Sequence, residues 1–142
     1  MKPKFIDYYM KIADVTSTLS YAKRLQVGAV IVKDNQILAT GYNGMPSGWE
    51  NVCEISDEKG LLKTKPEVLH AETNAIAKVA QSTESSQGST LFCTHAPCIE
   101  CAKLIYQSGI TTIYYRDNYR DDSGLNFLKL SGVNVHQYNN SL

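Results

Sequence analysis

Two short groups of potential metal ligands constrain the fold of this 142-residue chain more than any other feature of its sequence. The first group is His70-Ala71-Glu72, and the second is Pro97-Cys98-Ile99-Glu100-Cys101. Cysteines at positions i and i+3 of a helix lie on the same side, so both sulfur atoms can reach one ion. If His70 is a third ligand, the fold must bring the beginnings of two separate segments together.

The residue types in these groups favour a catalytic zinc site. Pro97 suits the first turn of a helix, where its missing N–H is not needed. The positive end of that helix favours the thiolate forms of Cys98 and Cys101, which a metal also requires. With His70 the site has three protein ligands, which leaves an open position for water. Glu72 lies close to His70 in the chain, as suits a carboxylate that accepts a proton from that water.

The cysteines support this interpretation without excluding others. The chain has four of them, Cys53, Cys93, Cys98 and Cys101. The first residues contain no apolar run typical of a secretory signal, and no stretch approaches the ~18 apolar residues of a membrane span. We therefore expect a cytoplasmic protein, in which a Cys-x-x-Cys pair binds metal or performs redox chemistry more often than it forms disulfides. A structural zinc and a thioredoxin-like site stay open as alternatives.

The pattern of apolar residues predicts helices and strands in the order α-β-β-α-β-α-β-α-β. The expected helices span residues 5–22, 67–81, 97–108 and 124–130. The expected strands span residues 27–32, 37–42, 90–94, 110–115 and 133–138, with a turn at Asp34-Asn35. In the first helix the apolar stripe consists of Phe5, Tyr8, Ile12, Val15, Leu19 and Ala22.

This order predicts one mixed sheet with helices packed on its faces. The last three strands alternate with helices and should be parallel, whereas the first two should form an antiparallel hairpin. No repeat or boundary divides the chain, so we expect a single domain over residues 1–142. Residues 43–66 show no clear period, and irregular segments of that length are often functional.

The composition narrows the range of partners. Lys and Arg together number 14, as do Asp and Glu, so the net charge is zero, and 43% of the residues are apolar. This mixture is typical of a folded globular domain rather than a disordered chain. A duplex nucleic-acid partner is disfavoured, because such partners select for clustered Lys and Arg. We also expect no membrane partner.

Together the two ligand groups form the pattern His-x-Glu followed by Pro-Cys-x-x-Cys, which is typical of zinc nucleobase deaminases. Four segments resemble the cytidine and deoxycytidylate deaminase superfamily, namely residues 26–32, 41–48, 70–76 and 97–103. The Gly-Tyr-Asn-Gly-x-Pro-x-Gly sequence of 41–48 and the Asn-Ala-Ile of 74–76 resemble its deoxycytidylate (dCMP) deaminase branch.

The resemblance implies a cytidine-deaminase-like three-layer α/β fold, with a five-stranded mixed sheet flanked by helices. It implies a hydrolase that converts dCMP to dUMP and ammonia, supplying dUMP for thymidylate synthesis within pyrimidine nucleotide metabolism. Zn²⁺ would be bound by His70, Cys98 and Cys101. Glu72 would move protons among water, N3 of the pyrimidine and the leaving amine. Glu100 is expected to orient the helix or pocket rather than to transfer protons.

The resemblance also suggests substrate contacts, each with a structural alternative. Asn43 would contact the deoxyribose or base, although an Asn beside Gly44 also suits a left-handed turn. The expected substrate-binding residues are Asn43, Arg24, Tyr115, Arg120, Ala71 and Thr94. Arg24, Arg116 and Arg120 are the candidates for the 5′-phosphate, or else solvated surface residues. Tyr115 and Tyr119 would stack on the base or serve in packing, and His95 would line the pocket or lie in an ordinary loop.

Members of the resembled branch are often hexamers that dCTP activates and dTTP inhibits. The expected effector site consists of Gly41, Tyr42, Gly44, Met45 and Gly48, with Mg²⁺ accompanying the nucleotide. Residues 49–65 match no pattern, and Cys53 is either a free thiol or a ligand of a second structural zinc. Cys93 is expected in the core, and His136 is expected to be structural.

Two other functions stay open at this point. One is a deaminase that acts on RNA or on a free nucleoside or base, against which the zero net charge counts for RNA. The other is a non-enzymatic zinc-binding module.

Overall fold

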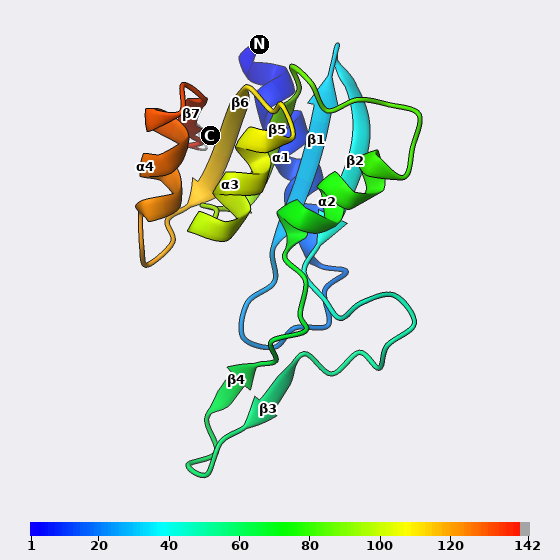
Figure 1. The fold of residues 1–142 in the computed structure, drawn as a ribbon, viewed down its shortest axis with the longest axis vertical. Coiled ribbons are helices and arrows are strands. Elements are labelled where there is room, and N and C mark those ends of the chain that lie inside the picture. The colour runs from blue at the N-terminus through cyan, green and yellow to red at the C-terminus, as the bar shows by residue number, and fades with distance from the viewer. Residues whose placement is uncertain (140–142) are drawn as a thin grey trace.

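The computed structural model describes residues 1–139 and contains the expected five-stranded mixed sheet. The strands follow the spatial order β2 (Gln36–Tyr42), β1 (Gly28–Lys33), β5 (Thr90–His95), β6 (Thr112–Asp117) and β7 (Asn134–Gln137) (Figure 1). Strand β1 is antiparallel to both β2 and β5, whereas β5, β6 and β7 are parallel to one another. The predicted hairpin and the predicted parallel strands are both confirmed.

The hairpin turn explains why β1 and β2 pair in this register. Asp34 and Asn35 have φ angles of 50° and 59°, and they connect the paired residues Lys33 and Gln36. Two left-handed residues form the turn whose twist matches that of two antiparallel strands. Asn and Asp tolerate this conformation better than other side chains.

Helices cover both faces of the sheet and produce three layers (Figure 1). Their bounds are α1 Pro3–Ser17, α2 Ala71–Ala80, α3 Ile99–Gln107 and α4 Ser123–Leu130. Alternate side chains of β1 face opposite layers, because successive residues of a strand point to opposite sides. Ala29 and Ile31 pack in the core formed with α2, α3 and α4, whereas Val30 and Val32 pack with α1. Within residues 1–139, no helix is long and apolar enough to cross a membrane.

The predicted extent of the first helix is wrong, and its predicted buried face is right only in part, since Phe5 and Ile12 do pack against the core. Helix α1 ends at Ser17, and the hydroxyl groups of Thr16, Ser17 and Thr18 donate to carbonyl oxygens of its last turns. Its buried residues are Tyr9, Met10, Ala13, Thr16 and Ser17, while the predicted Tyr8, Val15 and Leu19 are more than half exposed. Ala13 approaches the sheet so closely that a Cβ atom on Gly28 would overlap its carbonyl oxygen. The buried face is therefore the one on which Ala13 allows a close approach to Gly28, with Tyr9 and Met10 packed beside it.

Helix α2 begins at Ala71 rather than at residue 67. Leu69 instead forms an isolated β-bridge with Gly44, and their backbone hydrogen bonds measure 3.1 and 2.8 Å. His70 is also extended, with φ −83° and ψ 155°. Tertiary pairing of the backbone thus delays the start of this helix until after His70.

The segment predicted to be irregular contains a second, smaller sheet. Strands β3 (Glu54–Ser56) and β4 (Leu62–Thr64) form an antiparallel hairpin that projects away from the main sheet (Figure 1). At its tip, Asp57 Oδ1 accepts hydrogen bonds from the N–H groups of Lys59 and Leu61. Strands of three residues are too short to produce a recognisable alternation of apolar and polar residues.

Candidate metal centre and adjoining cavity

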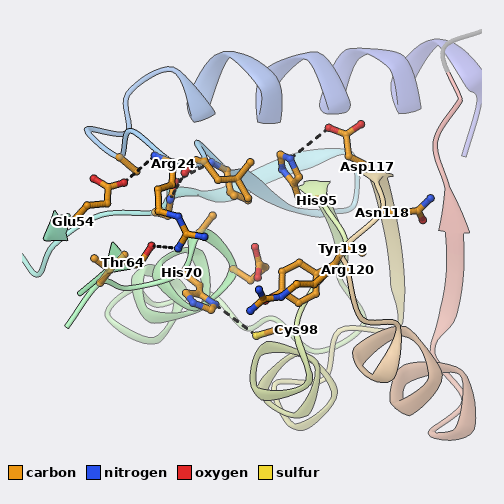
Figure 2. A pocket seen from close by; sticks show the side chains of 18 residues that line it. Arg24, Glu54, Thr64, His70, His95, Cys98, Asp117, Asn118, Tyr119 and Arg120 are labelled. Atoms are coloured by element: carbon orange, nitrogen blue, oxygen red, sulfur yellow. Dashed lines mark hydrogen bonds and ion pairs between the residues drawn. The ribbon is translucent and has the colours of Figure 1, made fainter. Parts of the chain in front are cut away.

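A cavity of about 640 Å³ opens at the carboxyl ends of β5 and β6 (Figure 2). Residues before β1, the end of β2, the β3–β4 hairpin, the starts of α2 and α3, and residues 117–120 line it. Volumes of ~300–1,000 Å³ are typical of sites that bind small molecules. The cavity therefore has the size of a metabolite-binding site, with both ligand groups at its wall.

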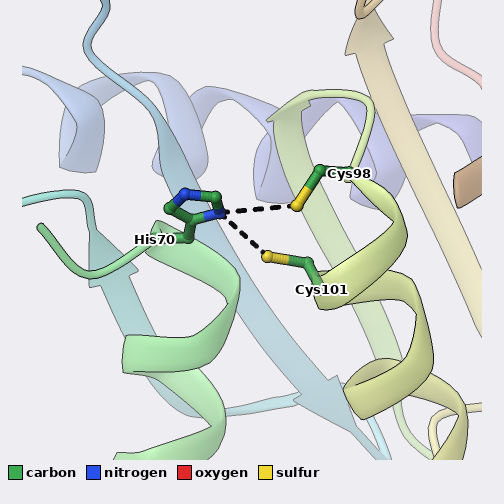
Figure 3. A group of neighbouring side chains, drawn as sticks. All are labelled: His70, Cys98 and Cys101. Carbon is green, nitrogen blue, oxygen red and sulfur yellow. Dashed lines mark hydrogen bonds between the residues drawn. The ribbon is translucent and has the colours of Figure 1, made fainter. Parts of the chain in front are cut away.

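The candidate metal ligands meet at the starts of two helices (Figure 3). His70 is the N-cap residue of α2, Cys98 is the N-cap residue of α3, and Cys101 lies in the first turn of α3. His70 Nδ1 lies 3.1 Å from Cys101 Sγ and 3.6 Å from Cys98 Sγ. Neither N-cap side chain forms a capping hydrogen bond, so both are available for another partner.

The geometry and chemistry of these donors fit Zn²⁺. Zinc bonds of ~2.0–2.3 Å in a tetrahedron place the ligand atoms ~3.5 Å apart, close to the distances between His70 Nδ1 and the two sulfur atoms. One imidazole and two thiolates form a borderline-soft ligand set that zinc prefers. Within residues 1–139, this is the one group of three or more His, Cys, Asp or Glu side chains that could hold an ion. The sequence prediction that these three residues converge agrees with this geometry, and their role as ligands stays a prediction.

The two cysteines of this group differ in their pKa values. Hydrogen bonds from Cys101 and then from His70 lower the pKa of the Cys98 thiol to about 3. Because Cys101 keeps its proton to make that bond, its own pKa is raised. One thiolate is therefore available at neutral pH before a metal binds, and the second forms when a metal displaces the remaining proton.

Glu72 is buried beside this group, in the first turn of α2, and it lines the cavity. Burial raises the pKa of its carboxyl group, while Cys101 and His70 oppose part of that effect. A carboxyl group with a raised pKa holds a proton more readily than an exposed one, which is the direction that general acid–base catalysis requires. Glu72 is therefore a candidate for proton transfer beside the His70, Cys98 and Cys101 group.

Four of the six residues predicted to bind substrate line the cavity: Arg24, Asn43, Ala71 and Arg120. Figure 2 shows Arg24 and Arg120 reaching the cavity from different walls. Tyr119 also lines it, with the Arg120 guanidinium carbon 5.7 Å from the centre of its ring. Arg116 is engaged elsewhere, because it forms ion pairs with Asp14 and Asp117.

The other two predicted residues, Thr94 and Tyr115, do not line the cavity. Thr94 is fully buried, and its hydroxyl oxygen accepts a hydrogen bond from the Gly28 N–H. Tyr115 is paired with Cys93 across β5 and β6, and both side chains pack in the main core. Their positions within the sheet place both side chains away from the lining of this cavity, and their contact with substrate stays a prediction. Cys93 is a core residue, as expected.

Asn43 does not adopt the left-handed conformation that was its structural alternative, because Asp34 and Asn35 are the non-glycine residues with positive φ in residues 1–139. Its side chain is held by the backbone before β1. Asn43 Oδ1 accepts from the Val27 N–H at 2.8 Å, and Asn43 Nδ2 donates to the Leu25 carbonyl oxygen at 2.8 Å. Asn43 therefore fixes one wall of the cavity.

Glu54 is a cavity residue that the sequence did not single out. Its carboxylate is buried, and Oε2 accepts hydrogen bonds from the N–H groups of Lys23 and Arg24 at 2.8 and 2.9 Å. Asp117 and Asn118 also line the cavity without having been predicted. These contacts join segments far apart in the chain, and no local pattern marks them.

His95 lines the cavity rather than lying in an ordinary loop. Its Nδ1 lies 3.0 Å from the Thr94 hydroxyl, and its Nε2 lies 3.5 Å from Asp117 Oδ2. Burial lowers the pKa of His95, although Asp117 opposes that effect. Its ring is therefore neutral near pH 7.

A second cavity, of about 650 Å³, lies beside the first. Four of the five predicted effector residues line it: Tyr42, Gly44, Met45 and Gly48. Gly41 does not, because it packs against α2, where an added Cβ atom would lie 2.6 Å from the Ala75 nitrogen. Cys53 also lines this cavity as a buried free thiol, and it belongs to no group of metal-ligating side chains in residues 1–139.

The sequence matches the family model described as "cytidine and deoxycytidylate deaminase zinc-binding region" over residues 3–117. Among solved structures, the chain is similar to the dCMP deaminase from the cyanophage S-TIM5 in complex with dCMP and dUMP. The two are 49% identical with a TM-score of 0.91, over 97% of this chain and 99% of that one.

Two curated proteins named deoxycytidylate deaminase are also similar. The Saccharomyces cerevisiae protein is 34% identical over 97% of this chain, and the Mus musculus protein is 36% identical over 93%. This chain spans 46% of the yeast protein and 78% of the mouse protein. It thus covers about half the length of the yeast relative.

Proposed function

Because the chain belongs to the cytidine and deoxycytidylate deaminase family, we propose that it catalyses hydrolytic deamination of dCMP to dUMP and ammonia. One observation carries this proposal: the His70, Cys98 and Cys101 group lies beside buried Glu72, at the wall of a cavity large enough for a nucleotide. Nucleobase deamination needs these components, a zinc site with an open position and a carboxyl group that is not a ligand.

His70, Cys98 and Cys101 would hold Zn²⁺, which supplies a Lewis acid that acidifies water. Glu72 would accept the proton of the attacking water and deliver it to N3 of the pyrimidine. Glu72 would then carry a proton to the amine that leaves C4. Burial supports this role, because the raised pKa of Glu72 brings its proton affinity closer to neutral pH.

Charge at the cavity supports a nucleoside monophosphate as the substrate. Arg24 and Arg120 reach the cavity from different walls, and guanidinium groups bind phosphate oxygens through paired N–H donors. A zero net charge gives less support to an RNA substrate, which would need a broader basic surface. The dCMP and dUMP of the cyanophage complex agree with a monophosphate substrate.

We further propose that residues 1–142 form one deaminase domain of a cytoplasmic hexamer that supplies dUMP for thymidylate synthesis. The second cavity is the proposed effector site, at which dCTP activates and dTTP inhibits, with Mg²⁺ accompanying the nucleotide. The regulatory role is supported by the way in which adjacent residues line different cavities. Asn43 and Glu54 line the first cavity, whereas their neighbours Gly44 and Cys53 line the second. A ligand in the second cavity would contact the wall of the first.

The test is ammonia release from dCMP, deoxycytidine, cytosine and a transfer-RNA hairpin, each with and without dCTP. We expect dCMP to be the fastest substrate. Faster release from any of the others would contradict the substrate, and a zinc-loaded protein that releases no ammonia would be a binding module. For regulation, we expect a sigmoidal dependence on dCMP that dCTP makes hyperbolic. A curve that neither dCTP nor dTTP alters would contradict the effector site.

A further inference from the structure

Arg24 is fixed in the cavity wall at two points, by two residues of the β3–β4 hairpin. Its backbone N–H donates to Glu54 Oε2 at 2.9 Å, and its guanidinium Nη1 donates to Thr64 Oγ1 at 3.1 Å. Glu54 and Thr64 are directly opposite each other in the hairpin register. One rung of the small sheet therefore holds both the backbone and the side chain of Arg24 (Figure 2).

Glu54 is unusual among the residues of this hairpin. The other five strand residues are exposed, whereas Glu54 is only 8% exposed. The same oxygen, Oε2, also accepts the N–H of Lys23 at 2.8 Å. Buried carboxylates are costly unless they are hydrogen-bonded, and two N–H donors on one oxygen meet that requirement. The hairpin thus presents a charged group inward at the point where it meets the segment before β1.

The rung itself is held closed at its base. The Lys65 N–H donates to the Cys53 carbonyl oxygen at 2.8 Å, directly beyond the Glu54–Thr64 pair. The rest of the hairpin extends away from the cavity (Figure 1). Placement of Arg24 therefore depends on the base of the hairpin and not on its tip.

Holding Arg24 matters because an unrestrained arginine loses much rotational freedom when it binds a ligand. The Arg24 side chain is exposed, and an exposed guanidinium without anchors would occupy many rotamers. Fixing its backbone and one N–H group in advance reduces the entropy lost on binding and leaves other N–H donors for an anion.

We propose that Glu54 is a positioning residue that makes the cavity selective for 5′-monophosphates, by holding Arg24 where it binds the phosphate. This inference rests on the proposed function. Glu54 acts through Arg24 and does not take part in proton transfer. Both donors to its carboxylate are backbone N–H groups, and the Arg24 guanidinium bonds to Thr64 instead, so its remaining N–H groups are free to bind a phosphate.

The test compares Glu54→Ala with Glu54→Gln, which keeps a carbonyl oxygen able to accept both N–H groups. Steady-state rates are measured with dCMP and with deoxycytidine, which lacks the phosphate. We expect Glu54→Ala to raise KM for dCMP about tenfold, the size of one lost charge-assisted contact, with kcat within about twofold. The kcat/KM for deoxycytidine should be unchanged, and Glu54→Gln should restore most of the KM.

Two further variants of the hairpin sharpen the test. Thr64→Val removes the acceptor of the guanidinium and should raise KM for dCMP by a smaller factor, about threefold. Glu58→Ala removes an exposed carboxylate at the tip and serves as the matched control, with wild-type KM expected. Equal losses of kcat/KM with dCMP and deoxycytidine in Glu54→Ala, or no rescue by Glu54→Gln, would overturn the proposal and leave the deaminase assignment intact.

A binding measurement separates this inference from the proposed reaction. Calorimetric titration of the zinc-loaded protein with dUMP and with deoxyuridine compares ligands that differ by the phosphate alone. We expect Glu54→Ala to weaken dUMP binding about tenfold without altering the affinity for deoxyuridine. If the variant binds dUMP more weakly but the wild-type protein releases no ammonia from dCMP, the proposed reaction is refuted and the positioning role stands. Unaltered affinity for dUMP in the variant would refute the positioning role.

Discussion

The metal centre and the hairpin wall of the cavity are built in different ways. His70, Cys98 and Cys101 lie at the starts of α2 and α3, two helices packed on the sheet through buried apolar side chains. The hairpin wall consists of irregular segments and two short strands. Buried Glu54 and half-buried Asn43 join these segments through hydrogen bonds to distant backbone groups.

This difference in construction suits the two regions to different tasks, the metal centre to the reaction and the hairpin wall to substrate binding. Regular elements in a close-packed core hold reacting groups to within a fraction of an ångström. Segments held by a few hydrogen bonds and little apolar packing open more easily, and they suit contacts that form and break with each substrate. We therefore expect changes at the metal centre to remove activity, and changes at the hairpin wall to alter KM and local stability.

The largest effect should come from Cys101→Ser. Serine is a poor zinc ligand, so the variant should lose most of its bound metal, and turnover should fall by more than about 10³-fold. Zinc content by atomic absorption and ammonia release check both outcomes. The control is Cys53→Ser in the second cavity, which should keep one zinc per chain. A lower zinc content in the control would show that Cys53 is a ligand after all.

Glu72→Gln should reduce kcat by about 10³-fold while the metal stays bound, because an amide cannot accept and return the proton. Its thermal stability should not fall, since the substitution removes a buried carboxyl group with a raised pKa. The matched control is Glu100→Gln, at an exposed residue that pairs with Lys103. Near-normal turnover in Glu72→Gln would exclude it as the proton carrier.

Asn43→Ala tests the hairpin wall of the cavity. It removes the partners of the Val27 N–H and the Leu25 carbonyl, which should cost ~1–3 kcal/mol in the free energy of unfolding. We expect KM for dCMP to rise about tenfold as the wall loosens. Urea denaturation and steady-state kinetics measure the two effects, with the exposed Asn126→Ala as control. A stable variant with a lower kcat alone would place Asn43 in the reaction rather than in the wall.

The smallest expected effect concerns pH and His95. Burial lowers the pKa of His95 in the folded state relative to ~6.5 in the unfolded chain, so the unfolded chain binds the proton more readily. The stability contributed by neutral His95 is complete above pH ~6.5 and is lost as the pH falls through the folded-state pKa.

The melting temperature of His95→Gln should therefore fall less than that of the wild type as the pH is lowered below ~6.5. Thermal melts over that pH range measure the difference. His136→Gln is the control, because His136 stacks on Tyr114 away from the cavity. An identical dependence on pH in wild type and His95→Gln would refute this assignment.

The sequence predicted much of the sheet and the convergence of His70, Cys98 and Cys101, because both depend on local patterns. The ligand spacing of Cys98 and Cys101, the turn at Asp34-Asn35 and the alternation of helices and strands after residue 90 are each visible within a few residues. The burial of Thr94 and Tyr115 was not predicted, since a strand pattern does not reveal which residues reach the end of the sheet.

Other features could be found only from the three-dimensional fold. Glu54 meets Arg24 across 30 positions of sequence, from a strand of three residues, so neither spacing nor periodicity marks the contact. The buried face of α1 depends on how closely Ala13 approaches Gly28, which no stripe of one helix encodes. Contacts of this kind are set by packing between elements rather than by propensities within them.

The placement of His70 and Cys98 at helix N-caps has a consequence for stability. Most helices place Ser, Thr, Asp or Asn at this position, where the side chain adds ~1 kcal/mol of stability. Neither His70 nor Cys98 makes such a bond. Replacing either residue by Ser or Asp would add a capping hydrogen bond to α2 or α3, and it would remove one of the three candidate metal ligands.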